Sequence, residues 1–246
     1  MVELDCPREI WENSQVREFL GDVLDLRFRG YAQEYGAKII PADVSDFFAT
    51  HIVTCQELPN GVLRPISSYK MVSVKRCREF GRAFSGLSVC ENSGAPSHAE
   101  SVRSIMEECD SLRRNLGYCY SWTIDPSIRK DEVLTQLVRN LVYATHKGWQ
   151  EENNVPEMVI AGVVRFKVDR YQESIGYQRI LDSNGDELAH FPHFELNREP
   201  VTLLHMKKHS DHCLEMVKKY AHFWNERLIY RSEERCEDFD QRLNVA

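Results

Sequence analysis

The chain has 246 residues, 42% of them hydrophobic, which is enough for a sizeable buried core. Its 31 basic and 38 acidic side chains give a formal charge of −7, which excludes a general affinity for nucleic acid because phosphate binding needs a basic face. The N-terminus is too charged for a secretory signal, and no run approaches the ~18 apolar residues of a membrane helix, so we expect a cytoplasmic protein without a membrane span.

The first quarter of the sequence predicts one or two helices followed by two antiparallel strands. Apolar residues recur at helical spacing from Val16 to Tyr31, and Gly36 ends this region. Two β-rich runs, "FFATHIVTCQEL" and "LRPISSYKMVSV", then flank Asn60-Gly61, a dipeptide typical of tight hairpin turns.

Helices and strands alternate in the next part of the chain. A polar connection leads to Ser97 and Glu100, whose spacing is that of a capping box and predicts a helix over about 98–115, ended by Gly117. The run "YCYSWTID" predicts a strand and 131–149 predicts a helix. The apolar run "MVIAGVVRF" is typical of a strand buried on both faces, and a short helix, "VDRYQESIG", leads to a last strand, "YQRIL".

This order predicts an α/β (α+β) fold with a mixed sheet and helices on both faces. A long amphipathic helix is expected from His212 to Tyr230, and the terminal "RSEERCEDFDQRLNVA" is expected to be solvated. No linker or repeat divides the chain. We therefore expect one domain over 1–205 and a helical extension over 206–246 that packs on it.

The segment "MVIAGVVRFKVDRYQESIGYQRI" resembles the end of the GNAT acyltransferase fold, in which a glycine and an aromatic residue, here Gly176-Tyr177, enter a strand after a short helix. Upstream, "YSWTIDPSIRKDEVLTQLVRNL" falls where that superfamily has its cofactor strand and helix. The resemblance implies splayed central strands, with the first strand pairing its main chain with the pantetheine arm of an acyl thioester and the helix start receiving phosphate. The residues implied for the donor are Ser121, Thr123 and Ile124 on the strand, and Arg129, Lys130 and Asp131 at the helix start.

The loop before this helix differs from that of GNAT enzymes that use coenzyme A. Those enzymes usually have a glycine-containing loop that wraps a pyrophosphate, whereas "SIRKDEV" contains no glycine. A single phosphate, such as that of the acyl-phosphopantetheine group on an acyl carrier protein, needs less wrapping. We therefore expect acyl carrier protein as partner and donor, acyl-CoA as the alternative donor, and no permanently bound cofactor.

The N-terminal segment "LRFRGYAQEYGAKIIPADVSDFFATHIVT" resembles acyl-homoserine-lactone synthases and the related long-chain N-acyl amino acid synthases. The matching positions are Arg27, Tyr31, Glu34, Asp43, Asp46 and His51. The resemblance implies acceptor binding by Arg27, Tyr31, Asp43 and Lys70, and catalysis by Glu34, Asp46 and Trp122. The acids bind or deprotonate the acceptor amine, and the main chain of Ser121 to Thr123, with Trp122 at its centre, polarises the thioester carbonyl. The chain lacks the tryptophan-rich first loop of the lactone synthases, which favours the amino acid branch.

The sequence therefore predicts an N-acyltransferase that moves a fatty acyl group from an acyl carrier protein thioester to the amine of an amino acid or similar small molecule. The alternatives are an acyl-CoA-dependent enzyme and a non-catalytic GNAT-like binding module. No thiol acid is assigned, because the family position for it carries Gln172. Five further cations have two interpretations, a docking face for the acidic carrier or an ordinary charged surface. They are Arg103, Arg113, Arg114, Arg139 and Lys147.

Histidines and cysteines do not predict a metal site. His205, His209 and His212 would share a helical face, but a strand end near Leu204 and an N-cap at Ser210 would break that register. The eight cysteines have neither metal-site nor disulfide spacing, so we expect reduced thiols.

Overall fold

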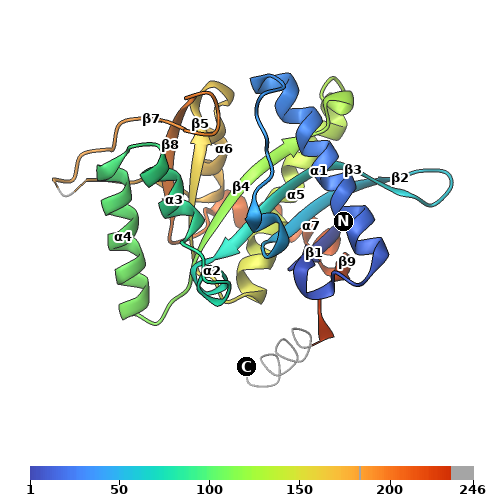
Figure 1. Ribbon diagram of the computed structural model, residues 1–246, viewed down its shortest axis with the longest axis horizontal. Coiled ribbons are helices and arrows are strands. Elements are labelled where there is room, and N and C mark those ends of the chain that lie inside the picture. Colours follow the sequence, from blue (N-terminus) through green and yellow to red (C-terminus); the bar gives the residue numbers. More distant parts are fainter. Residues whose placement is uncertain (183, 234–246) are drawn as a thin grey trace. The chain divides into compact units, whose positions relative to one another are not determined.

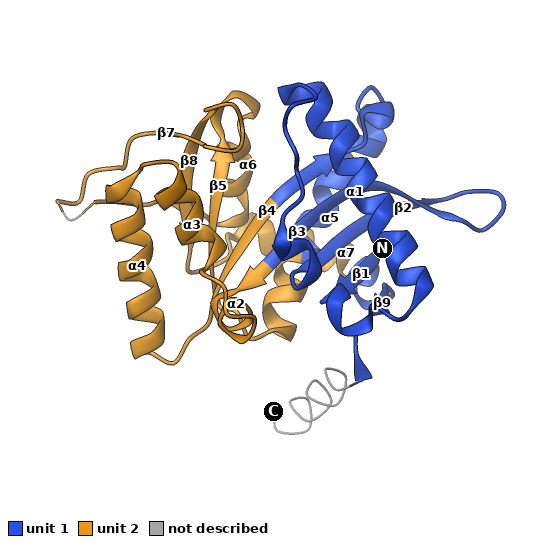
Figure 2. Ribbon diagram, viewed as in Figure 1, with its two compact units in different colours: residues 1–71, 121–145, 222–246 blue, residues 72–120, 146–221 orange. Residues whose placement is uncertain are grey.

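The computed structural model of the chain describes residues 1–182 and 184–233 (Figure 1). These residues form two compact units, and the chain passes between them several times (Figure 2). Unit 1 comprises Met1–Met71, Ser121–Thr145 and the described part of His222–Ala246, and unit 2 comprises Val72–Tyr120 and His146–Ala221. Most of the predicted solvated tail, including Cys236, lies outside the described residues.

Unit 1 is a set of strands with helices on both faces. In chain order its elements are β1 (Val2–Asp5), η1 (Pro7–Ile10), α1 (Ser14–Tyr35), η2 (Val44–Phe47), β2 (Thr50–Glu57), most of β3 (Leu63–Ser73), the last four residues of β4 (Leu116–Ile124), η3 (Pro126–Ile128), the first part of α5 (Glu132–Glu152), the end of α7 (Asp211–Asn225) and β9 (Leu228–Tyr230). β1 pairs antiparallel with β2 and parallel with β9, and β2 pairs antiparallel with β3. The predicted hairpin at Asn60-Gly61 is confirmed: Gly61 has a φ of 79° and Leu58 N donates to Val62 O at 2.9 Å.

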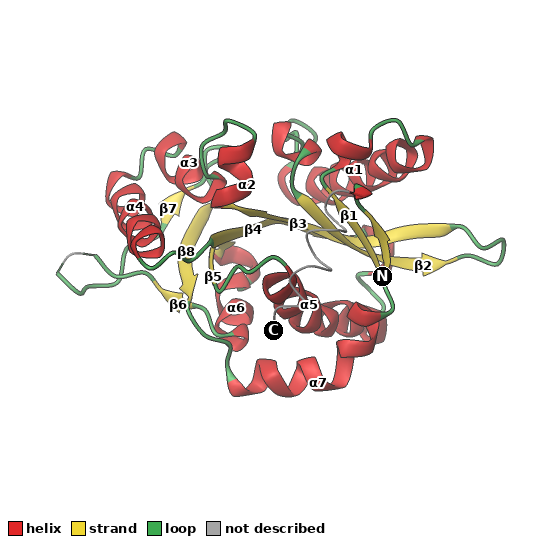
Figure 3. Cartoon of the chain, turned by 90° about the horizontal axis from the view of Figure 1, so that it is seen from below, coloured by secondary structure: helices red, strands yellow, loops and turns green. Residues whose placement is uncertain are grey.

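The apolar periodicity of α1 fixes its place on the strands. Asn13 caps its first turn by accepting a hydrogen bond from Gln15 N at 2.9 Å. Its buried stripe, which includes Val16 and Leu20, packs on Leu4 of β1. The opposite face of the strands is covered by α5, as Figure 3 shows. The residues packed there are Ile66 of β3, Ile128 of η3 and Val138 of α5.

Unit 2 has a second set of strands between helices. Its elements are α2 (Val74–Glu79), α3 (Ser85–Asn92), α4 (Pro96–Ser111), the first five residues of β4 (Leu116–Ile124), the end of α5, β5 (Glu157–Val163), η4 (Val164–Phe166), α6 (Val168–Ile175), β6 (Gln178–Arg179), β7 (Phe191–Pro192), β8 (Pro200–Met206) and most of α7 (Asp211–Asn225). β4 pairs parallel with β5, β5 antiparallel with β8, and β8 antiparallel with β6 and β7. The predicted mixed α/β fold is confirmed. None of the described helices has the length and apolar character needed to cross a membrane.

Three local predictions are wrong. The predicted capping box does not form, because α4 begins at Pro96 and its N-cap residue, Ala95, has no side-chain acceptor. Gly117 does not end this helix but lies inside β4, where a Cβ would come within 2.3 Å of Met158 Sδ. The predicted polar connection before α4 contains α3, because Val89 and Cys90 give its Ser- and Gly-rich sequence a buried side.

The C-terminal helix is confirmed but shorter than predicted. Ser210 caps it, with its Oγ accepting a hydrogen bond from Cys213 N at 3.0 Å, and it ends at Asn225 rather than Tyr230. The last apolar residues, Leu228 to Tyr230, form β9 instead. Leu228 N donates to Met1 O at 3.1 Å, so this segment extends the β1 edge of the strands. The division into 1–205 and 206–246 stays a prediction.

Candidate functional site

Four predicted or matching residues form a buried ionic cluster in unit 1. Arg27 of α1, Asp46 of η2, His51 of β2 and Lys70 of β3 are each at most 1% exposed. The Arg27 guanidinium donates to the Asp46 carboxylate and lies 2.9 Å from His51 Nδ1. His51 Nε2 lies 2.8 Å from the Asp46 carbonyl oxygen, and Lys70 Nζ lies 3.0 Å from Asp46 Oδ1. The fold thus brings these residues together and pairs their charges with one another.

Asp43 connects this cluster with the surface. It caps η2 by accepting a hydrogen bond from Ser45 N at 2.6 Å, while its own N–H donates to Asp46 Oδ2 at 2.8 Å, which is a capping box. Lys70 Nζ lies 3.2 Å from Asp43 Oδ2, and the Asp43 side chain is 41% exposed. The buried Lys70 ammonium therefore holds a carboxylate that solvent and small molecules can reach.

Electrostatics fix the protonation states inside the cluster. Burial raises the pKa of the Asp46 carboxyl, but Lys70 and Arg27 outweigh it and lower that pKa to about 2. Burial, with Arg27 beside the ring, lowers the pKa of His51 to about 3. The neutral ring donates from Nε2 to a carbonyl that only accepts, so Nδ1 accepts from Arg27. Burial also lowers the pKa of the Lys70 ammonium despite its carboxylate neighbours.

A second ion pair joins α1 to the segment after β4. Glu34 accepts a hydrogen bond from the Arg129 guanidinium, and each side chain is 26% exposed. Arg129 Nε also donates to Ile124 O at 3.1 Å. Close packing at Gly30 makes this possible, because a Cβ there would come within 2.4 Å of Thr123 Cγ2 and 3.5 Å of the Arg129 guanidinium. The end of β4 therefore lies directly against α1.

β4 changes conformation at the point where its ladder with β5 stops. The described ladder ends with Cys119 opposite Ile160, and Ser121 has a φ of 58°. A left-handed serine costs about 1–2 kcal/mol, so such a residue marks a constrained site. Trp122 is half-buried, and its indole N–H donates to Ser67 Oγ at 3.2 Å, which donates in turn to Thr123 O at 2.9 Å.

Two aspartates accept hydrogen bonds at the starts of η3 and α5, where the resemblance implies a phosphate site. Asp125 accepts a hydrogen bond from Ser127 N at 2.7 Å, and Asp131 accepts one from Leu134 N at 2.9 Å. Two aspartates thus take helix-start N–H groups that an anion would otherwise use. Lys130 is exposed at this point, whereas Arg129 faces Glu34.

The other predicted residues lie apart from this region or at its edge. Tyr31 is half-buried on α1, with its ring centroid 5.3 Å from that of Tyr35. Among the cations considered for carrier docking, Arg103 pairs with Glu91, Arg114 with Glu157 and Lys147 with Glu151. Arg113 and Arg139 are exposed.

The three C-terminal histidines do not share one helical face. His205 of β8 lies 2.9 Å from Glu157, and His209, which precedes α7, lies 3.4 Å from Cys213 Sγ. His212 is exposed on α7. Within the described ranges, no group of three or more potential ligands is arranged to hold a metal ion, and the seven described cysteines are free thiols.

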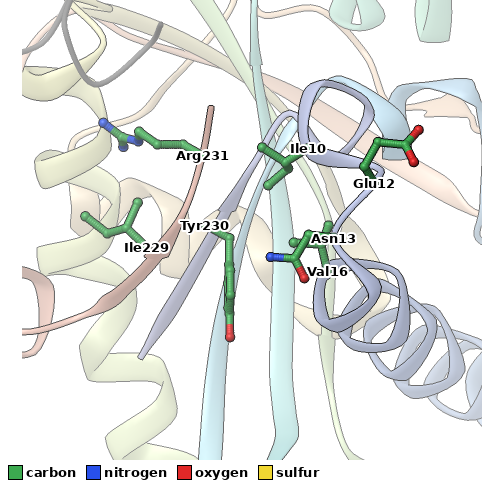
Figure 4. Close-up of a pocket in the computed structure, with 7 residues that line it drawn as sticks. All are labelled: Ile10, Glu12, Asn13, Val16, Ile229, Tyr230 and Arg231. Carbon is green, nitrogen blue, oxygen red and sulfur yellow. The ribbon is translucent and has the colours of Figure 1, made fainter. Parts of the chain in front are cut away.

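A separate cavity of about 250 Å³ lies between α1 and β9 in unit 1 (Figure 4). Its lining residues are Ile10, Glu12, Asn13, Val16, Ile229, Tyr230 and Arg231. In Figure 4 the Asn13 amide points toward the Tyr230 ring, while the Glu12 and Arg231 side chains point away in opposite directions. The predicted site residues do not line this cavity.

Comparison with known proteins places the fold. No protein family's sequence profile matches the chain, and no curated protein matches it. Among solved structures, the CoA-dependent acyl-homoserine lactone synthase MesI is 12% identical, with a TM-score of 0.50 over 94% of this chain and 99% of MesI. The chain therefore has the fold of this synthase, a GNAT-like mixed α/β fold.

Two further solved structures are similar at lower TM-scores. FeeM, an N-acyl amino acid synthase from uncultured soil microbes, is 13% identical, with a TM-score of 0.44 over 78% of this chain and 90% of its own. BjaI, a CoA-dependent acyl-homoserine lactone synthase, is 8% identical, with a TM-score of 0.48 over 100% of this chain and 98% of its own. The predicted resemblance to acyl-homoserine-lactone synthases is confirmed at the level of the fold by MesI.

Two residues that position the end of β4, Gly30 and Ser67, were not recognised from the sequence alone. Gly30 was not singled out, although a glycine inside a helical pattern signals a close approach of another element. Ser67 was missed because the pairing of its hydroxyl with Trp122 and Thr123 depends on contacts across more than 50 residues.

Proposed function

We propose that the chain is an N-acyltransferase that moves a fatty acyl group from a thioester to the amine of an amino acid or similar small molecule, with acyl carrier protein as donor. The observation that carries this proposal is the contact between α1 and the end of β4. It brings the main chain of Ser121 to Ile124 and the Glu34 carboxylate into one compact unit. The GNAT fold supports the reaction class.

The proposed reaction uses these groups in sequence. Glu34 takes one proton from the acceptor ammonium, and the free amine attacks the thioester carbonyl carbon. The main chain around Trp122 stabilises the resulting oxyanion. The C–S bond then breaks as the C–N amide bond is completed, the nitrogen loses its second proton, and the thiolate leaves and is protonated to the thiol.

The buried cluster has a positioning role in this proposal. With a pKa of about 2, Asp46 is a poor proton acceptor, and together with Arg27 and Lys70 it is withdrawn from solvent. These residues hold η2, so that Asp43 is the part of the cluster presented to the acceptor.

Two features bear on the donor. The absence of glycine in 127–133 favours a single phosphate near Lys130 over a wrapped pyrophosphate. Acyl-CoA is the second candidate donor, because MesI is described as CoA-dependent.

The test is mass spectrometry of lipid extracts from a bacterial host that expresses the chain, alongside assays of purified protein with acyl carrier protein and CoA thioesters. Wild type and Glu18→Gln, an exposed change on the same helix, should produce new N-acyl amino acids. Glu34→Gln should reduce them at least about a hundredfold, as expected for loss of a general base. Folded wild-type protein that releases no thiol with either donor would instead indicate a binding module.

A further inference from the structure

The geometry of the Glu34–Arg129 ion pair suits the binding of a ligand that carries both charges better than it suits a purely structural salt bridge. The residues are 95 positions apart in sequence, and each side chain keeps 26% of its surface exposed. Arg129 is anchored independently of Glu34, because its Nε donates to Ile124 O at 3.1 Å. Removing Glu34 from the pair would therefore leave the guanidinium in place at the end of β4.

The surroundings of the pair favour a small polar ligand. Tyr31 lies three residues before Glu34 and so on the same face of α1 by helical spacing, and its ring centroid is 5.3 Å from that of Tyr35. Ring faces beside a carboxylate attract an ammonium group. On the other side, Thr123 is 4% exposed, and its Oγ1 is buried without a hydrogen-bond partner among the described residues. A buried hydroxyl of this kind is costly unless a ligand or water completes its bonding.

We propose that Glu34 and Arg129 recognise an α-amino acid zwitterion, with the α-ammonium on Glu34 and the α-carboxylate on Arg129. This inference rests on the proposed function and assigns Arg129 to the acceptor instead of the donor phosphate. A partly exposed ion pair contributes little by itself, so opening it for a ligand that supplies both opposite charges has a small cost. The planar guanidinium matches a carboxylate in a bidentate manner.

Amines without a carboxylate fit this pair poorly. Their ammonium would satisfy Glu34 but leave the Arg129 cation beside a second positive charge and without its anion. Charge-assisted hydrogen bonds of this kind correspond to about a tenfold to hundredfold difference in binding. The acceptor is therefore expected to be an amino acid with a free carboxyl group.

Three matched acceptors test the inference: L-leucine, L-leucinamide and 3-methylbutylamine. The wild-type kcat/KM should be at least about tenfold higher for leucine than for the two analogues, which lack the carboxylate. Arg129→Gln should lose that preference because only its activity on leucine falls. Arg129→Lys should keep part of the preference, and Arg78→Gln, an exposed cation of unit 2, should behave as wild type. Equal acylation of all three compounds by the wild type would overturn the proposed recognition of a zwitterion but would still support the acyltransferase proposal.

Binding without a donor separates the two proposals. Saturation-transfer NMR should detect leucine but not 3-methylbutylamine on the wild type, and neither preferentially on Arg129→Gln. If this pattern holds but no acylation occurs with any thioester, the acyltransferase proposal fails, whereas the proposed binding of an amino acid by Glu34 and Arg129 is supported. If folded wild-type protein binds leucine and 3-methylbutylamine equally, the proposed recognition of an amino acid by Glu34 and Arg129 is wrong.

Discussion

Asp46 is the residue on which the buried charges of unit 1 depend. Its carboxylate faces two cations, Arg27 and Lys70, and its carbonyl accepts from His51. A buried pair of charges contributes little net stability compared with apolar packing, but removing one partner leaves the others desolvated and uncompensated. The cluster is therefore more sensitive to single substitutions than its net contribution suggests.

Asp46→Asn is expected to lower the free energy of unfolding by about 3–5 kcal/mol, because both buried cations lose their carboxylate. The matched control is Asp110→Asn, which removes an exposed partner of Arg78 and should cost less than about 1 kcal/mol. Urea unfolding of the two variants measures the difference. Equal effects would mean that the cluster is not held by its charges.

Stability should also fall with acidification through His51. Its pKa is about 3 in the folded chain and about 6.5 when unfolded, so its contribution is complete above pH 6.5 and is lost as pH falls toward about 3. Between pH 7 and pH 5 this amounts to about 2 kcal/mol. Chemical denaturation at both pH values should show a loss about 2 kcal/mol smaller in His51→Gln than in wild type. His222→Gln, an exposed change on α7, should keep the wild-type slope.

At the scale of elements, the contact between α1 and β4 aligns the proposed site, and two glycines of α1 allow it to be tested. A Cβ at Gly30 would meet Thr123 Cγ2 at 2.4 Å, whereas one at Gly21 would meet nothing within 4 Å. Gly30→Ala should therefore destabilise the chain by about 1–3 kcal/mol through overpacking, and lower acyl transfer by displacing β4. Gly21→Ala should stabilise it by about 0.5–1 kcal/mol through helix propensity. Thermal unfolding and thiol release measure both; an active, stable Gly30→Ala would contradict the role of this contact.

The elements that sequence reasoning predicted are those with strong periodicity of their own. The apolar stripe of α1, the Asn60-Gly61 hairpin and the buried run of β5 each carry a local signal. β9 carries none: Leu228 to Tyr230 continue the helical pattern of α7 and become a strand only because β1 offers an edge. Tertiary contact overrides propensity in such short segments.

The candidate site shows the same division. The sequence predicted Arg27 and Lys70 for acceptor binding and Asp46 for catalysis. It did not predict their complete burial, which follows from the packing of η2 between α1 and β3. Nor does any local pattern reveal that Glu34 meets Arg129, because that pair forms only when α1 lies on the end of β4. Long-range ion pairs depend on the fold and not on spacing.

At the scale of the whole molecule, two continuous elements belong to both compact units. β4 passes from unit 2 to unit 1 between Tyr120 and Ser121, and α5 passes from unit 1 to unit 2 between Thr145 and His146. Unfolding one unit alone would cut a helix and a strand in their interiors and expose buried residues of α5 on both sides of the break. The described chain is therefore expected to unfold as one cooperative system.

Two buried tryptophans test this cooperativity, because Trp224 lies in unit 1 and Trp149 in unit 2, with 4% and 2% of their surfaces exposed. Two triple variants, in which the other three tryptophans are replaced by phenylalanine, each leave one reporter. Within each variant, urea transitions followed by fluorescence and by far-ultraviolet circular dichroism should coincide, because circular dichroism records both units while each tryptophan records one. A fluorescence midpoint separated from the dichroism midpoint in either variant would mean that β4 and α5 break at the unit boundary. The two units would then fold as separate modules, despite the strand and the helix that they share.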